Sequence, residues 1–257
     1  HGKCPCKKAV ESVPLTGRKQ VLLVSDQEVL SSSLTQYSDY MKSAKKSSSK
    51  DGAAMVTRVG KKIAAATEQY LRNNGLESEI KNFAWEFNLV NDPQVNAFCM
   101  PGGKIVVYEG LMQLVSSDDE LAVVVGHEVA HAVAKHSNER MSQQLMAQYG
   151  AQILGQALSN KSAAVQKIGA SVYGLGAQYG VMLPFSRKHE SEADYMGLVF
   201  MAMAGYNPAV AVNFWQKMSA GKSGSTPEFM STHPSDATRI NEIKQHLPEI
   251  EKYRVKK

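Results

Sequence analysis

The chain has 257 residues, of which 43% are hydrophobic and 21% are charged. This composition is ordinary for a globular protein, and the length is enough to bury a core without disulfide staples. The formal net charge is +5, but the Lys and Arg residues are spread along the chain, so the charge indicates solubility and weak attraction to anionic lipid and argues against nucleic-acid recognition. No apolar run reaches the roughly 18 residues that a membrane-spanning helix needs.

The N-terminal part of the sequence predicts a tail followed by helices. Residues 1–20 contain Pro and Gly and predict an extended tail, so we expect residues 21–257 to form a single domain. The pattern over residues 25–40 is helical, and residues 43–52 predict a polar, basic loop. Residues 56–74 predict an amphipathic helix whose apolar side is typical of core packing.

A small sheet is predicted next. Hydrophobic and polar residues alternate over residues 83–89, which is typical of a half-buried strand. Residues 96–100 and 104–108 predict two more strands, joined into a hairpin by the turn at Pro101–Gly103. An exposed edge of this sheet could take an extended peptide by strand addition, whereas the alternative is a sheet that only covers a helix.

The most informative stretch is a predicted buried helix that begins near Ser117. Ser117 and Glu120 match a capping box, and residues 121–125 are apolar on nearly every side of a helix. Within this helix lies the sequence His127-Glu128-Val-Ala-His131.

Residues four apart on a helix lie on the same face, so the imidazoles of His127 and His131 can bind one metal ion together. Glu128 lies about 100° round the helix from His127, where a base for an activated water is needed. A pattern with three fixed positions also occurs by chance in unrelated proteins. The buried context favours zinc, because unpartnered polar groups there would cost a few kcal/mol each.

Residues 137–182 are rich in Gln, Met, Ala, Gly and Ser, and they predict two helices over residues 138–158 and 161–182. Small residues weaken the second helix, which favours a mobile segment or the lining of a cleft.

A further helix is predicted over residues 187–204, and one of its faces carries two acids among small and apolar residues. Glu190 is the carboxylate expected to complete the metal site, and Asp194, one turn later, is placed to accept the spare N–H of a ligating histidine. Glu192 lies on the opposite face and is expected to be solvated. The structural alternative for Glu190 and Asp194 is an ion pair with Arg187 or Lys188.

Helices are also predicted over residues 209–218 and 236–247, and the loop over residues 219–227 is followed by His233-Pro234. His233 could donate to a reacting oxyanion, occupy the open metal position as a gate, or be a helix-cap or surface histidine.

His136, five residues past His131, lies about 140° off the ligand face and cannot share the metal on a straight helix. His1, His189 and His246 have no supporting context, and the three cysteines, Cys4, Cys6 and Cys99, do not have the spacing of a zinc finger.

Three separated motifs occur in one order: the His127–His131 pattern, Ser186-Arg-Lys-His-Glu190-Ser-Glu-Ala-Asp194, and Thr232-His233-Pro234. In this order they resemble the M48 family of zinc metallopeptidases, over roughly residues 80–245. The resemblance implies a mainly helical, gluzincin-like α+β domain with a small β-sheet beside the metal-binding helix. It also implies one zinc ion held by His127, His131 and Glu190. Asn96 and Pro101–Gly103 look like the substrate-side sheet of that family.

The absence of membrane spans makes the chain resemble the soluble branch of the family. That resemblance implies a periplasmic protein acting in outer-membrane quality control, with Cys4 or Cys6 as a candidate for a lipid-bearing cysteine that anchors it peripherally to the membrane.

We therefore expect a zinc endopeptidase that hydrolyses unfolded or misassembled envelope proteins, with Glu128 as general base and His233 as a candidate donor. The main alternative is a chaperone or assembly factor for outer-membrane proteins with a gated, largely latent zinc site. A zinc amidase acting on the cell wall is the third hypothesis.

Overall fold

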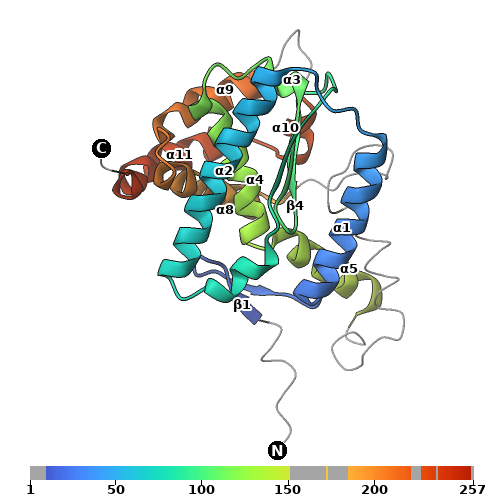
Figure 1. The fold of residues 1–257 in the computed structure, drawn as a ribbon. Helices are drawn as coiled ribbons and strands as arrows, with labels where there is room; N and C mark the ends of the chain where they lie inside the picture. Colours follow the sequence, from blue (N-terminus) through green and yellow to red (C-terminus); the bar gives the residue numbers. More distant parts are fainter. Residues whose placement is uncertain (1–9, 151–171, 173–184, 221–226, 236, 256–257) are drawn as a thin grey trace, which may run out of the picture.

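The computed structural model describes residues 10–150, 172, 185–220, 227–235 and 237–255. The fold is α+β, as the sequence predicted, with a three-stranded sheet between helices (Figure 1). None of the helices in these ranges is both long and apolar enough to cross a membrane.

The sheet contains β3 (Glu86–Val90), β4 (Ala97–Met100) and β5 (Lys104–Tyr108) in the order β3-β5-β4. The predicted hairpin is present, because β4 and β5 pair antiparallel with Ala97 opposite Val107, whereas β3 pairs parallel with β5. The turn between β4 and β5 needs glycine at two positions, since φ is +98° at Gly102 and +87° at Gly103. Because β5 lies between β3 and β4, β4 is an edge strand of the sheet.

Helices cover both faces of the sheet. On one face lies α1 (Asp26–Ser43), which begins with Ser25 in a capping box. On the other lie α2 (Lys50–Asn73) and α4 (Asp118–Val133) (Figure 1). Strand residues alternate between the two cores: Phe98 and Met100 face α1, whereas Ala97 packs in the larger core with α2 and α4.

The centre of the molecule is the packing of α4 against α8 (Arg187–Met203). Both helices begin at a serine N-cap: Ser117 Oγ accepts from Glu120 N, and Ser186 Oγ accepts from His189 N. The two helices touch through glycines, because a Cβ at Gly126 would lie 2.7 Å from the carbonyl oxygen of Gly197. This close approach brings the histidines of α4 next to the acids of α8.

Shorter elements complete the described part. They are β1 (Val10–Ser12), β2 (Lys19–Val21), η2 (Glu77–Asn82), α3 (Glu109–Met112), α5 (His136–Tyr149), η4 (Pro208–Val210), α9 (Ala211–Ala220), α10 (Glu228–Thr232), α11 (Ala237–Ile250) and η5 (Glu251–Tyr253).

The structure differs from the sequence expectation in several segments. The expected tail forms, from Val10 on, an antiparallel hairpin of β1 and β2 whose turn has positive φ at Leu15 and Gly17 and whose Val13 is buried. Helix α2 begins at Lys50, because Ser49 caps it by accepting from Gly52 N. The helix predicted over residues 138–158 is described as α5 only to Tyr149, and most of the one predicted over residues 161–182 lies outside the described residues.

Candidate metal centre

Two histidines of α4 form the base of the site. His127 and His131 lie one helical turn apart, both are buried, and their Nε2 atoms are 3.1 Å apart. The residues of α4 around them are almost all buried, so the rings are held in a dry environment. Two imidazole nitrogens that face each other at this distance are typical of a shared ligand position.

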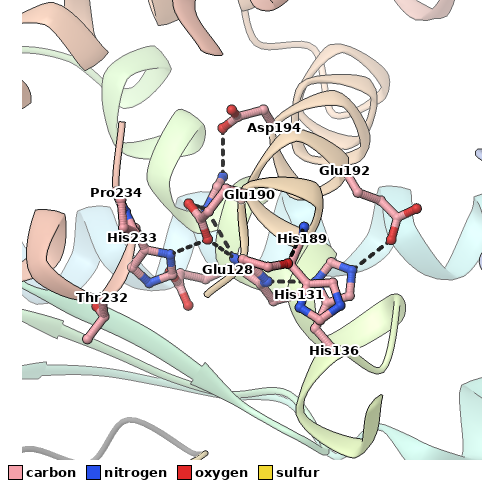
Figure 2. Close-up of polar contacts among 12 residues, drawn as sticks. Glu128, His131, His136, His189, Glu190, Glu192, Asp194, Thr232, His233 and Pro234 are labelled. Carbon is pink, nitrogen blue, oxygen red and sulfur yellow. Dashed lines mark hydrogen bonds and ion pairs between the residues drawn. The ribbon is translucent and has the colours of Figure 1, made fainter. Parts of the chain in front are cut away.

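The third group comes from α8. Glu190 is fully buried, and its Oε2 lies 3.1 Å from His127 Nε2. Its Oε1 lies 2.9 Å from His131 Nε2 (Figure 2). The structure thus brings together the three residues that the sequence analysis selected as ligands.

The geometry and chemistry of this cluster fit a zinc ion. Zinc–nitrogen bonds of about 2.0–2.1 Å in a tetrahedron put neighbouring ligand atoms about 3.3 Å apart, close to the separations seen here. The ligand atoms of His127, His131, Glu190 and His233 all lie within 4.8 Å of one another. Glu190 Oε2 is buried and has no hydrogen bond of good geometry, although His127 Nε2 and Arg239 Nη1 each lie 3.1 Å from it. A buried carboxylate oxygen without a hydrogen bond is suited to bind a cation.

The charges of the cluster also favour a cation. Burial by itself would lower the pKa of His127, but the carboxylates of Glu190 and Asp194 raise it to about 9. Burial would likewise raise the pKa of Glu190, yet His233, His127 and His131 hold it well below the usual range. A site that stabilises positive charge on an imidazole also stabilises a dication in its place.

His127 is supported from behind by Asp194. Its Nδ1 lies 3.0 Å from Oδ1 of Asp194, the residue expected to accept its N–H, but the approach is not a hydrogen bond of good geometry. Asp194 is held in turn by the buried Arg239, whose Nε and Nη2 donate to it at 2.6 and 2.9 Å. The carboxylates of Asp194 and Glu190 thus pair with Arg239, which lies 3.1 Å from Glu190 Oε2.

Sequence reasoning missed Arg239. The available signal was its position on α11, where it shares the buried face with Ile243 and Ile250. A charged residue on an otherwise apolar face calls for a buried partner.

The other candidate ligand, His131, contacts residues for which the sequence analysis found no role in the site. His131 Nδ1 lies 2.7 Å from His136 Nδ1, and His136 Nε2 lies 2.7 Å from Glu192 Oε1 (Figure 2). The expectation that Glu192 is solvated is wrong, since it is 7% exposed. His189 is also buried and lies 2.6 Å from Glu139 Oε1, so it has a partner after all.

The physical reason is a break after α4. The helix ends at Val133 and Lys135 adopts φ +57°, so α5 starts in a new direction at His136. A helical wheel continued through His136 therefore gave the wrong direction for its side chain. Burial lowers the pKa of His136 to about 4, against the opposing effect of Glu192.

Glu128 and His233 lie on the side of the cluster that faces β4 and Phe185. Glu128 Oε2 accepts from Cys99 N of β4 at 3.3 Å, and its Oε1 lies 3.0 Å from His233 Nε2. His233, at the end of α10, also approaches Glu190 Oε1 with Nδ1 at 2.8 Å (Figure 2). Both ring nitrogens of His233 are thus engaged by carboxylates.

The space beside these residues is small. A cavity of about 20 Å³ lies between Glu128, His233, β4 and Phe185, which is enough for one water molecule and too little for a peptide. Phe185 covers it, with its ring stacked on His131 at 4.0 Å between centroids.

Comparisons with known proteins agree with this geometry. Residues 57–247 match the model of peptidase family M48. The mitochondrial metalloendopeptidase OMA1 of Schizosaccharomyces pombe is 36% identical over 76% of this chain and 53% of its own length. The Arabidopsis thaliana protein of that name is 40% identical over 65% of this chain and 33% of its own. The beta-barrel assembly-enhancing protease of Yersinia pestis is 33% identical over 63% of this chain and 36% of its own. The chain thus spans about half, or less, of the length of these relatives.

These names correct one expectation. A periplasmic location with a lipid anchor was predicted, but the relatives from fission yeast and Arabidopsis are named as mitochondrial. The chain is similar both to relatives named as mitochondrial and to a protease of Yersinia pestis, so membership of the family does not by itself indicate a location. Cys4 and Cys6 lie outside the described residues.

Proposed function

The chain belongs to peptidase family M48, as its three motifs predicted, and from this premise we propose that it is a zinc-dependent endopeptidase. The observation that carries the proposal is the buried cluster of His127, His131 and Glu190, with Glu128 beside it. We assign the first three as metal ligands. Asp194 then fixes the tautomer of His127 from behind.

Zinc, when bound, supplies the Lewis acidity that makes a water molecule and a carbonyl reactive at neutral pH. Glu128 is the base in this proposal. Its Oε1 takes a proton from the attacking water, whose oxygen adds to the scissile carbonyl carbon. When the carbon–nitrogen bond breaks, Glu128 returns that proton to the leaving amine. The hydrogen bond from Cys99 N to Oε2 holds the carboxylate in place for both transfers.

We assign the edge of β4 to substrate binding. Tyr108 N donates to Asn96 O, so the backbone groups of Phe98 and Met100 also point toward β5. Those of Ala97 and Cys99 then point to the outer edge, where no strand pairs in the described part of the chain. Their N–H groups already donate to Asn96 Oδ1 and Glu128 Oε2, so a substrate strand would pair through their carbonyl oxygens or displace these contacts. An extended segment of an unfolded protein can add to this edge beside Glu128.

His233 is assigned as a gate in this proposal. Because Glu128 and Glu190 already engage both of its ring nitrogens, it has no free donor for a reacting oxyanion in this arrangement. It also occupies space that a peptide carbonyl needs, which fits the 20 Å³ cavity.

The closed site also supports a second function, that of a binding or assembly factor that holds unfolded proteins without cutting them. The name of the relative from Yersinia pestis, a beta-barrel assembly-enhancing protease, is compatible with either activity.

The test uses Glu128→Gln. Casein cleavage by the zinc-loaded protein should fall by at least about a thousandfold, a loss at the upper part of the range for a general base. The zinc content, measured by elemental analysis, should stay at that of the wild type, because Glu128 is not among the assigned ligands.

His127→Ala is the matched comparison and should lose the zinc together with the activity. Wild-type protein that binds zinc and unfolded casein but never cleaves it would favour the binding function. Equal cleavage by the wild type and Glu128→Gln would refute the assigned base.

A further inference from the structure

The turn of the N-terminal hairpin reaches the back of the metal centre. Arg18 lies between β1 and β2, and its guanidinium contacts two carboxylates on different helices. Nη1 and Nη2 donate to Glu139 of α5 at 2.9 and 2.7 Å, whereas Nε and Nη2 donate to Glu192 of α8 at distances from 2.9 to 3.2 Å. Thr16 of the same turn donates to Glu192 Oε2 at 2.7 Å.

This contact continues to a metal ligand. Glu192 Oε1 accepts from His136 Nε2, and the other nitrogen of His136 meets His131 Nδ1, each at 2.7 Å. The tautomers follow from the geometry. If Nε2 of His131 gives its lone pair to the metal, its proton is on Nδ1 and is donated to Nδ1 of His136. His136 must then carry its own proton on Nε2, which is the atom that faces Glu192.

A second branch encloses the same ring. Glu139 Oε1 accepts from His189 Nε2 at 2.6 Å. The ring of His189 stacks on that of His136 with centroids 4.2 Å apart and planes 18° apart. Arg18 therefore fixes two carboxylates. Glu192 binds the edge of the His136 ring, and Glu139 holds His189, whose ring stacks on the face of His136.

The charges agree with this arrangement, because the guanidinium of Arg18 lies between two largely buried carboxylates, 2.7 Å from Glu139 Oε1 and 2.9 Å from Glu192 Oε1. Arg18 offers two parallel donors to Glu139, a fork that a lysine cannot reproduce.

We propose that Arg18 is a positioning residue of the metal centre. The N-terminal hairpin, which lies outside the family match over residues 57–247, thus completes the support of His131. Removing the guanidinium leaves two largely buried carboxylates without their shared cation, and the ring of His136 loses its fixed partner. This inference rests on the proposed function, because it requires His131 to be a zinc ligand.

The test measures zinc affinity of the full chain by competition with a chromogenic chelator. Arg18→Gln should weaken zinc binding about tenfold, the lower end of the effect expected when a partner behind a ligand is lost. The matched control is Arg58→Gln. Arg58 makes a similar forked pair with Asp118 of α4, at 2.7 and 2.8 Å, but at the exposed end far from the histidines. The zinc affinity of the Arg58→Gln variant should equal that of the wild type.

Glu192→Gln provides an independent readout, because it keeps the size of the side chain while losing its charge. It should also weaken zinc binding about tenfold. In the double variant with Arg18→Gln the two losses should not multiply, because both changes break the same chain of contacts. If the two losses of zinc affinity multiply, the contact chain from Arg18 through Glu192 to His131 is refuted.

Equal zinc affinity of Arg18→Gln and Arg58→Gln would overturn the proposal. If Arg18→Gln does not fold, Glu192→Gln decides, and wild-type zinc affinity in that variant overturns the proposal as well. A wild-type chain without measurable zinc affinity would refute the proposed function itself, which is a distinguishable result.

Discussion

At the scale of single residues, the centre is defined by where each imidazole places its two nitrogens. His127 and His131 turn Nε2 toward Glu190 and Nδ1 toward a partner behind them. His233 instead points both nitrogens at carboxylates, so its ring holds Glu128 and Glu190 at a fixed separation. Carboxylates on both sides, despite burial, raise the pKa of His233 and stabilise its charged form.

This contrast leads to a prediction for His233→Ala. Casein cleavage should rise about tenfold, because opening the site no longer costs the ~1.5 kcal/mol of a charge-assisted hydrogen bond. Initial rates with zinc in excess measure the effect. His246→Ala removes an exposed histidine of α11 and should leave the rate unchanged. A lower rate in His233→Ala with zinc retained would contradict the gate and favour an oxyanion donor.

At the scale of elements, the site depends on how closely α8 approaches α4. A Cβ at Gly197 would lie 2.7 Å from His127 N and 2.8 Å from its Cα, so only glycine fits at this crossing. Glu190 and Asp194 lie on the same helix as Gly197, which means that the crossing distance also sets the distance from these acids to the histidines.

Gly197→Ala should therefore disturb both stability and zinc binding. Overpacking should lower the free energy of unfolding by about 1–3 kcal/mol, and zinc binding should weaken because α8 must move away from His127. Urea titration and chelator competition measure the two effects.

Gly60→Ala is the matched control for this change. Its Cβ would lie 2.2 Å from the ring of Phe87, on the side of α2 that faces the sheet. It should lower stability and leave zinc affinity as it is. Equal zinc affinity in both variants would show that the crossing does not position Glu190.

At the scale of the whole molecule, one ionic cluster joins segments that are far apart in the chain. Arg18 of the hairpin, Glu139 of α5 and Glu192 of α8 meet behind the metal centre. Hydrogen bonds from Arg18 and His189 overcome burial and hold the pKa of Glu139 well below its usual range, and the pKa of Glu192 is lowered to about 2.

These shifts predict loss of stability in acid. A carboxylate whose pKa is depressed in the folded state stabilises the fold above its unfolded pKa of about 4.3 and loses that contribution as the pH falls toward the folded value. The free energy of unfolding should therefore fall between about pH 5 and about pH 2. Urea titrations of chelator-treated protein measure it, because protons would otherwise compete with zinc for the histidines.

Glu192→Gln should show a flatter pH dependence, because one of the two carboxylates no longer titrates. Wild-type and variant curves that run parallel in this range would contradict the assignment of the acid sensitivity to this cluster.

The local parts of the site could be predicted from the amino-acid sequence. The i, i+4 spacing of His127 and His131 and the out-of-place acids Glu190 and Asp194 follow from helical periodicity, which operates over one or two turns. The Ser117 cap of α4 follows from the neighbouring capping-box residues. The β4–β5 hairpin was predicted for the same reason, since its turn residues are adjacent in the chain.

The groups that support the candidate ligands from distant parts of the chain could not be predicted in this way. Four supporting residues were missed or misplaced: Arg239, Glu192, His136 and Arg18. Their contacts depend on the left-handed conformation of Lys135, on the close crossing of α4 and α8 at Gly126 and Gly197, and on the packing of the N-terminal hairpin. Periodicity gives the face of a helix on which a residue lies, but the partner that covers that face is set by packing between segments far apart in sequence.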